Sequence, residues 1–153
     1  MITFRKATMM DVEGLHSLVN EFAEKGLMLP RSRNTLYEAL REFTIIEANG
    51  KFAGAGALHI IWDNLAEIRA VAIRPEYQHQ GIGQQLILEL LNEAVALKIH
   101  QVFALTYQVD FFTKCGFQIV SKEEMPSKVW KECINCPKFP NCDEVAMIKE
   151  LKF

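Results

Sequence analysis

The stretch Ile68–Gly83 reads IRAVAIRPEYQHQGIG and passes from an apolar run, through a polar loop, to the start of an amphipathic segment. The apolar run predicts a buried strand over 65–73 that Pro75 ends, and the amphipathic segment predicts a helix over 81–97. A helix leaves its first N–H groups without internal partners, and its dipole makes that end positive, so anions bind there. The stretch therefore predicts an anion site between a strand and a helix.

Two glycines in this loop suit a pyrophosphate. Gly81 and Gly83 have no Cβ atom, so phosphate oxygens can approach the backbone N–H groups, and consecutive N–H groups form a concave nest for an anion. An isolated Gly-x-Gly pair more often only shapes a helix entrance, and it is the surrounding strand and helix that favour the anion site. The loop is neither a dinucleotide fingerprint nor a P-loop, because the third spaced glycine and the Gly-Lys-Ser/Thr sequence are absent.

Two helices are predicted before this stretch. Thr8 and Asp11 form a capping box, and apolar residues at helical spacing follow it as far as Gly26. A second helix begins at Ser32 or Asn34. The apolar residues that the second helix is expected to bury are Leu36, Ala39, Leu40 and Phe43.

Strands are predicted on both sides of the central stretch. Residues 44–47 and 51–61 form a hairpin around Asn49-Gly50, a turn sequence typical of hairpins. Gly54 and Gly56 in the second of these strands suggest a bulge or the close approach of another backbone. After the long helix we expect a strand over 101–106, a short helix over 109–114, and strands over 117–121 and 145–149.

Composition and charge exclude several classes of protein. The chain has 153 residues, of which 50% are hydrophobic and 24% charged, with a net charge of −2. These values suit one globular domain over 1–153. No basic stripe is visible, so we expect no nucleic-acid partner. No signal peptide or membrane-spanning run is visible either, so we expect a cytoplasmic protein that does not bind membranes.

Cysteines gather near the C-terminus. Cys133, Cys136 and Cys142 lie in an irregular segment at about 131–142, and Cys133-x-x-Cys136 has the spacing of a zinc knuckle. A closed zinc site normally needs a fourth ligand, for which Cys115 is one candidate, and no second pair has the usual spacing. Reduced thiols are therefore the preferred interpretation, and no metal is firmly predicted.

The sequence Gln78-x-x-Gly81-x-Gly83 after a strand resembles the acetyl-CoA motif of the GCN5-related N-acetyltransferase superfamily, and the order of predicted elements resembles that fold over nearly the whole chain. The resemblance implies an α/β fold, with a mixed, mostly antiparallel sheet that is splayed at the acetyl-CoA site and has helices on both faces. It implies acetyl-CoA as co-substrate, with the backbone of Val71, Ala72 and Ile73 pairing with the pantetheine arm. The residues that would hold the pyrophosphate are Gln78, His79, Gln80, Gly81, Ile82 and Gly83. Gln80 departs from the family, in which Arg or Lys is frequent before the first glycine.

Acetyl transfer needs a neutral amine, a base for its proton, a donor that polarises the thioester carbonyl and a proton for the leaving thiolate. The resemblance implies Glu67 as the base, acting directly or through water, and an ordinary strand-edge carboxylate is an equal alternative. Phe112 stands where the family usually has the tyrosine that protonates the thiolate. The candidates to replace that acid are Tyr107, which is the better acid, and Thr106.

A sharper resemblance is to the short, stand-alone N-acetylglutamate synthases. It is carried by residues 26–33, 65–67, 105–107, 111–112 and 128–144. It implies direct transfer, without a covalent enzyme intermediate, to the α-amine of L-glutamate, which is the first step of arginine biosynthesis. A homodimer is the assembly that the family suggests.

The same resemblance places Arg31 against the α-carboxylate of the acceptor. A dicarboxylate calls for permanently charged, bidentate partners, and arginine is the residue that provides them. Arg33 and Arg69 are further candidates for substrate binding. Without the resemblance, Arg31 and Arg33 would be interpreted as solvated loop cations.

Three other functions stay open at this point. One is acetyl transfer to another small amine or to a protein N-terminus. A second is a non-catalytic CoA-binding sensor, which the absent tyrosine and Gln80 keep open. A third is a metal-binding adaptor built on the C-terminal cysteines.

Overall fold

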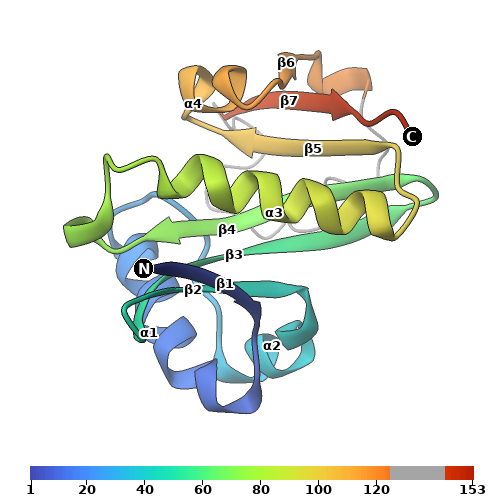
Figure 1. The fold of residues 1–153 in the computed structure, drawn as a ribbon. Helices are drawn as coiled ribbons and strands as arrows, with labels where there is room; N and C mark the ends of the chain where they lie inside the picture. The colour runs from blue at the N-terminus through green and yellow to red at the C-terminus, as the bar shows by residue number, and fades with distance from the viewer. Residues whose placement is uncertain (125–143) are drawn as a thin grey trace. The chain divides into compact units, whose positions relative to one another are not determined.

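The computed structural model describes residues 1–124 and 144–153. In this part of the chain seven strands hydrogen-bond in the order β1-β2-β3-β4-β5-β7-β6. Figure 1 labels these strands and the α-helices. The strands are β1 (Ile2–Lys6), β2 (Phe43–Ala48), β3 (Lys51–Trp62), β4 (Leu65–Ile73), β5 (Gln101–Thr106), β6 (Gln118–Ile119) and β7 (Val145–Glu150). The α-helices are α1 (Val12–Glu24), α2 (Arg33–Glu38), α3 (Ile82–Ala96) and α4 (Val109–Lys114). Short 3-10 turns cover Met9–Asp11, Leu40–Glu42, Pro75–Tyr77 and Lys122–Glu124.

The contacts divide the chain into two compact units. The first comprises residues 1–58 and 68–90, and the second comprises 59–67 and 91–153. Both contain strands and helices, and the sheet is mostly antiparallel with a parallel pair, β4 and β5. The α/β class and the mixed sheet expected from the sequence are therefore confirmed.

A tight hairpin organises the strands of the first unit. Asn49 and Gly50 have φ angles of 52° and 81° and join β2 to β3, as their sequence predicts. The β2–β3 register shifts between Ile46 and Glu47, so one extra residue of β3 lies opposite this point as a bulge. On its other edge β2 pairs antiparallel with β1, from Ile2 opposite Ala48 to Lys6 opposite Thr44.

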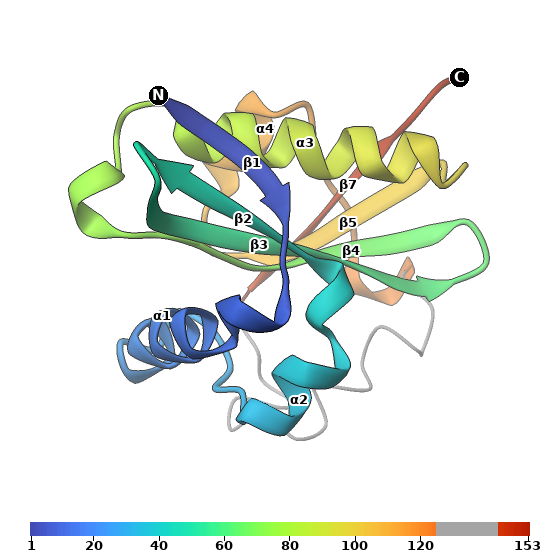
Figure 2. The same ribbon diagram turned by 60° about the horizontal axis from the view of Figure 1, so that its bottom comes forward.

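Helices pack on both faces of this part of the sheet (Figure 2). Alternation along β3 assigns the faces, because Ala55 and Ala57 lie in the core under α1 and α2, whereas a Cβ at Gly56 would meet Leu86 and Leu90 of α3. The core under α1 and α2 consists of Val12, Leu15, Leu18, Phe22, Leu36, Leu40, Phe43, Ile45, Ala55, Ala57 and Ala72. The strands near the loop at 78–83 are therefore packed between α1 and α2 on one face and α3 on the other.

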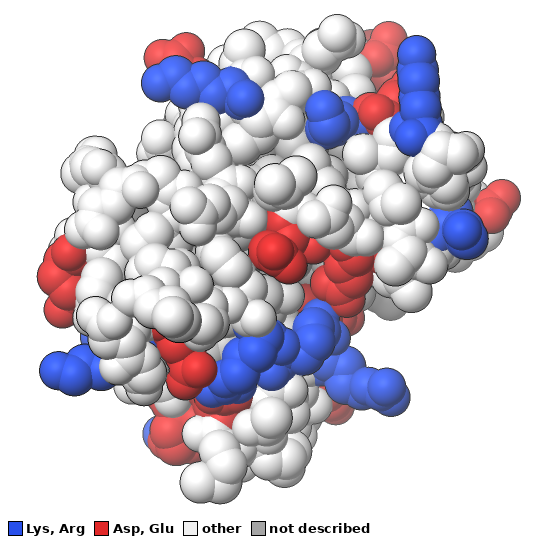
Figure 3. Space-filling model, in the orientation of Figure 1, with Lys and Arg blue, Asp and Glu red and all other residues white. Residues whose placement is uncertain are grey.

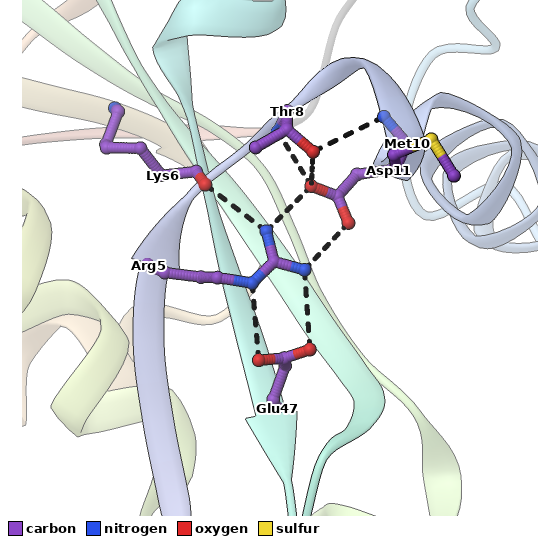
Figure 4. Close-up of polar contacts among 6 residues, drawn as sticks. All are labelled: Arg5, Lys6, Thr8, Met10, Asp11 and Glu47. Atoms are coloured by element: carbon purple, nitrogen blue, oxygen red, sulfur yellow. Dashed lines mark hydrogen bonds and ion pairs between the residues drawn. The ribbon is translucent and has the colours of Figure 1, made fainter.

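Capping and ion pairs fix the 3-10 turn Met9–Asp11, which leads into α1. The predicted capping box is present, since Thr8 N–H donates to Asp11 Oδ2 at 2.7 Å and Thr8 Oγ1 accepts from the N–H of Met10. Asp11 also accepts two hydrogen bonds from Arg5, at 2.7 and 2.9 Å, and Glu47 lies 3.2 Å from Nε of the same guanidinium (Figure 4). The Arg5 guanidinium lowers the pKa of Asp11, and the two carboxylates raise the pKa of Arg5.

The second unit is built on a long antiparallel pair. β5 pairs with β7 over six residues, from Gln101 opposite Glu150 to Thr106 opposite Val145, and β6 adds to the other edge of β7. The start of β4 pairs in parallel with β5, and this ladder ends at Glu67 opposite Phe103. Leu65 and Phe103 are buried in a cluster with Ile61, Leu105, Val120 and Ile148.

One expectation about the elements is wrong, and one strand is missing from the prediction. Phe43 is the first residue of β2, opposite Ala57, and not part of the second helix, because the chain becomes extended there and buries the ring in the core. β1 is absent from the prediction, although Ile2 and Phe4 alternate with polar residues as a strand requires. It is a short strand at the sheet edge, so its periodic pattern covers few residues.

Candidate functional site: the loop that enters α3

The loop before α3 has the backbone of an anion-binding nest. The φ angles are −74° at Gln78, 65° at His79 and 80° at Gly81, and that of Gln80 is not positive. Gln78 is extended, with a ψ of 161°, and together with His79 it forms a turn. Successive N–H groups in such a turn can point toward one concave side, where an anion binds. His79 is a non-glycine residue with positive φ, which costs free energy and is found mainly where function or packing requires it.

Space and charge at this entrance also favour an anion. Among the described residues other than Gly81 and its two chain neighbours, no heavy atom lies within 4 Å of the position that a Cβ would take on Gly81. The first backbone bond of the helix is from Gln85 N–H to Gly81 O at 3.3 Å, so the N–H groups of residues 82–84 precede the regular pattern. The first turn of α3 contains no acidic side chain that would repel an anion.

Two glutamine side chains brace the loop rather than extend from it. Nε2 of Gln78 donates to Ile73 O at 2.8 Å, and Nε2 of Gln80 donates to Glu76 O at 3.3 Å. The amide of Gln78 therefore ties the loop to the end of β4, and its contribution to an anion comes through the backbone. The carbonyl of Ile73, for which pairing with a pantetheine arm is predicted, already accepts this bond.

The strand that leads into the loop is irregular. Ala70 has a φ of 53°, which is strained for a residue with a Cβ and interrupts the regular strand between Arg69 and Val71. β3 approaches β4 closely two residues later, since a Cβ on Gly54 would lie 2.6 Å from Ala72 O. The predicted close approach at Gly54 is confirmed, and nothing in the sequence signals the conformation of Ala70.

The arginines predicted to bind substrate occupy different surroundings. Arg31 is half-buried in the loop between α1 and α2. Arg33 is exposed at the first residue of α2, and its guanidinium binds the Glu13 carboxylate of α1 at 2.9 Å. This pair raises the pKa of Arg33 and lowers that of Glu13. Arg69 is half-buried on β4. Arg31 and Arg33 are two residues apart in the sequence, one in the loop before α2 and the other at the first residue of that helix.

The predicted proton-transfer residues belong to the second unit. Glu67 is 8% exposed, at the end of the β4–β5 ladder. Thr106 is buried at the end of β5, where its Oγ1 accepts the N–H of Gln108 at 2.8 Å, whereas Tyr107 is 39% exposed. Phe112 is buried and packs edge-on against Phe111 and Phe117. The ring that replaces the expected tyrosine is therefore part of the core.

The remaining expectations concern metals, charge and membranes. Cys133, Cys136 and Cys142 lie outside the described residues. Within 1–124 and 144–153 no group of three or more metal-ligating side chains is found, and burial raises the pKa of the Cys115 thiol. On the face in Figure 3 basic and acidic side chains lie next to one another rather than in separate fields. In the part of the chain that the structure describes, no helix has the length and apolar character needed to cross a bilayer.

Comparison with known proteins agrees with this geometry. Residues 12–117, more than half of the chain, match the model of the acetyltransferase (GNAT) family. An uncharacterised N-acetyltransferase of Chlorobaculum tepidum is 36% identical over 149 residues, which cover 96% of this chain and 95% of that protein. An amino-acid acetyltransferase of Mycobacterium tuberculosis is 37% identical over 131 residues, 84% of this chain and 75% of the relative.

Solved structures agree at the level of the fold. The N-acetylglutamate synthase of Neisseria gonorrhoeae, complexed with coenzyme A and N-acetyl-glutamate, has a TM-score of 0.91 and 26% identity to this chain. The match covers 100% of this chain and 36% of the gonococcal protein, so the similarity extends over about a third of that larger enzyme.

Proposed function

The chain belongs to the acetyltransferase (GNAT) family and is an acetyl-CoA-dependent N-acetyltransferase, and we propose that it acetylates the α-amine of an amino acid, L-glutamate above all. This reaction is the first step of arginine biosynthesis. The observation that carries the proposal is the loop at 78–83, which has a positive φ at His79 and at Gly81 and lies open beside Gly81 at the entrance of α3.

The residues of this loop fit a diphosphate. Backbone N–H groups of residues 79–83 are the donors that we assign to it, because Gln80 replaces the cation frequent in the family and the side chain of Gln78 is engaged with Ile73. When bound, acetyl-CoA supplies the thioester whose acetyl group is transferred. Val71 and Ala72 follow the irregular residue Ala70, and we assign to this short segment the backbone contacts with the pantetheine arm.

The acceptor is proposed from its charge. Glutamate presents an α-carboxylate and a side-chain carboxylate, and Arg31 is a half-buried, permanently charged residue in the loop between α1 and α2. Arg33 is exposed and binds Glu13, whereas Arg31 is half-buried, and we assign the α-carboxylate to Arg31. The name of the tuberculosis relative and the N-acetyl-glutamate bound to the gonococcal enzyme support the same class of acceptor.

Proton transfer is assigned to two residues of the second unit. Glu67 accepts the proton of the attacking amine, directly or through water. Tyr107 donates a proton to the leaving thiolate, since it is 39% exposed and Phe112 has no acidic group. Thr106 is the weaker candidate, because an aliphatic hydroxyl is a much weaker acid than the phenol of a tyrosine.

An acceptor panel tests the proposed function. Purified protein is incubated with acetyl-CoA and L-glutamate, L-glutamine, L-aspartate, L-arginine or a peptide with a free N-terminus, and the acetylated products are measured by mass spectrometry. Glutarate, which has both carboxylates and no amine, is the matched control. We expect the highest kcat/KM with L-glutamate and no product with glutarate.

Two other outcomes would replace the proposal. A higher kcat/KM with another amino acid or with the peptide would give a different acceptor to the same enzyme. Binding of CoA without product from any amine would indicate the sensor function, which the absence of the usual tyrosine favours.

A further inference from the structure

A side chain of α1 holds the backbone of Arg31. Asn20 Nδ2 donates to Arg31 O at 2.8 Å, and Asn20 Oδ1 accepts the N–H of Arg31 at 3.1 Å. The second hydrogen of Nδ2 is donated to His16 O, one turn earlier in α1, at 2.9 Å. The amide of Asn20 thus uses both donors and its acceptor, and it pairs with Arg31 as a neighbouring strand would.

The loop on either side of Arg31 is fixed as well. α1 ends in a Schellman motif, with Leu27 N–H bound to Phe22 O and Gly26 at a φ of 74°. After Arg31, the hydroxyl of Ser32 caps α2 by accepting the N–H of Thr35 at 3.2 Å. Arg31 therefore lies between two helix termini, and the contact with Asn20 joins its backbone to the body of α1.

We propose that Asn20 is a positioning residue for acceptor recognition, which fixes the backbone from which the Arg31 side chain binds the carboxylate of the acceptor. The inference rests on the proposed function of Arg31. An arginine binds a carboxylate well only when its two N–H groups are already aligned, and a backbone held at both its N–H and its C=O reduces the freedom lost on binding. In this role Asn20 acts through the backbone of Arg31, to which its side-chain amide is bound.

The chemistry of the contact requires an asparagine. Aspartate has nearly the same shape but no N–H, so at position 20 it would place carboxylate oxygen against the carbonyls of Arg31 and His16. Alanine removes the contact without adding charge. The next residue, Glu21, is exposed and offers a control position on the same turn of α1.

Kinetics of Asn20→Asp and Asn20→Ala test this role, with Glu21→Gln as the control. We expect the KM for the amino-acid acceptor to rise about tenfold in both Asn20 variants, since each leaves Arg31 O without its donor. Two further measurements on Asn20→Ala report on the rest of the first unit: the KM for acetyl-CoA and the thermal unfolding midpoint. We expect the KM for acetyl-CoA to stay within about twofold of the wild-type value. Glu21→Gln should keep both KM values.

A double variant separates positioning from a general effect. If Asn20 acts through Arg31, Asn20→Ala in an Arg31→Ala background should change kcat/KM for the acceptor by less than about twofold, because the single changes are not additive. Additive losses, or an unchanged acceptor KM in Asn20→Ala, would overturn the inference and leave the acetyltransferase function intact. A wild-type protein that binds CoA but acetylates no amino acid would overturn the proposed function, and this inference with it. If Asn20→Asp does not fold, Asn20→Ala alone decides.

Discussion

Two loops of the first unit each lead into a helix, and they are built in opposite ways. The loop at 78–83 depends on its backbone, since left-handed residues at His79 and Gly81 orient the N–H groups and two glutamine side chains only brace it. The loop at 27–32 depends on side chains, because Asn20 holds Arg31 from α1. Ligand binding at the loop at 78–83 should survive most side-chain substitutions and should weaken when the backbone conformation changes. Ligand binding at the loop at 27–32 should weaken when the side chains that hold it are substituted.

This difference matches the ligands assigned to each loop. A diphosphate has many equivalent oxygens, which a ring of N–H groups can satisfy without a particular side chain. The carboxylate of an amino acid is smaller than a diphosphate, and the site must distinguish it from other anions. A bidentate guanidinium at one fixed position is therefore the better partner. Substitutions that separate the two KM values test this division directly.

The largest effect is expected at Arg31. Arg31→Ala should lower kcat/KM for the amino-acid acceptor about a hundredfold, because two charge-assisted hydrogen bonds are lost. Arg31→Lys should recover part of the loss, since the charge returns without the planar pair of donors. Steady-state kinetics with both substrates varied measure this, and a rise in the acetyl-CoA KM of equal size would contradict the division between the loops.

A smaller effect is expected where β3 supports the strand that enters the phosphate loop. The Cβ in Gly54→Ala would lie 2.6 Å from Ala72 O, a backbone atom, so the variant should lose about 2 kcal/mol of unfolding free energy and bind CoA more weakly. Gly56→Ala is the matched control, because its Cβ would meet the flexible end of Leu86 at 2.9 Å. Urea unfolding and CoA titration of both proteins decide, and equal stabilities would show that the close approach is unimportant.

Substitution of Asp11 should lower the stability of the fold without changing the KM for either substrate. Arg5 holds the pKa of Asp11 below its ordinary 3.8, so this carboxylate stabilises the folded protein above that pH and the stabilisation is lost as the pH falls through the lowered value. Asp11→Asn should cost about 1 kcal/mol near pH 7, a modest figure because the Arg5 side chain is 38% exposed. The difference in urea unfolding between the two proteins should shrink below pH 3.8, and a difference that grows there would contradict the assignment.

The smallest effect is expected for the exposed ion pair beside Arg31. Glu13→Gln removes the partner of Arg33, and because both side chains are largely in solvent the acceptor KM should change by less than about threefold. The remaining change should disappear in high salt. A tenfold effect that persists in salt would instead give the Glu13–Arg33 pair a share in fixing the acceptor loop.

Much of the fold follows from local patterns in the sequence. β4 and β5 have the predicted bounds because short buried strands are limited by Pro75 on one side and by polar turns on the other. The capping box at Thr8, the turn at Asn49-Gly50 and the end of α1 at Gly26 are each specified by one or two residues. Phe43 and β1 are exceptions. An apolar residue after a helix fits either a further turn or a buried strand until the packing is known, and β1 is too short to show a clear pattern.

The candidate site is less accessible to such reasoning. The glycine at 81 indicates a positive φ, and the histidine at 79 indicates it only weakly, whereas the alanine at 70 gives no indication of a left-handed backbone. The role of Asn20 cannot be predicted from the sequence for another reason: its partner Arg31 is eleven residues away, and the contact is with the backbone of that residue. Tertiary structure imposes these conformations and contacts, so the sequence alone identified the loops but not how each is held.

Calorimetric titration with CoA tests the central claim, that backbone N–H groups at the entrance of α3 bind the diphosphate. Gly81→Ala and Gly26→Ala form a matched pair, because the φ angles are 80° and 74° and, among the described residues, no atom lies within 4 Å of either new Cβ. Each variant carries a similar strain of about 1–2 kcal/mol in its loop. We predict that Gly26→Ala binds CoA like the wild type and that Gly81→Ala binds about tenfold more weakly. Equal affinities in all three proteins, or no heat from the wild type, would contradict the account.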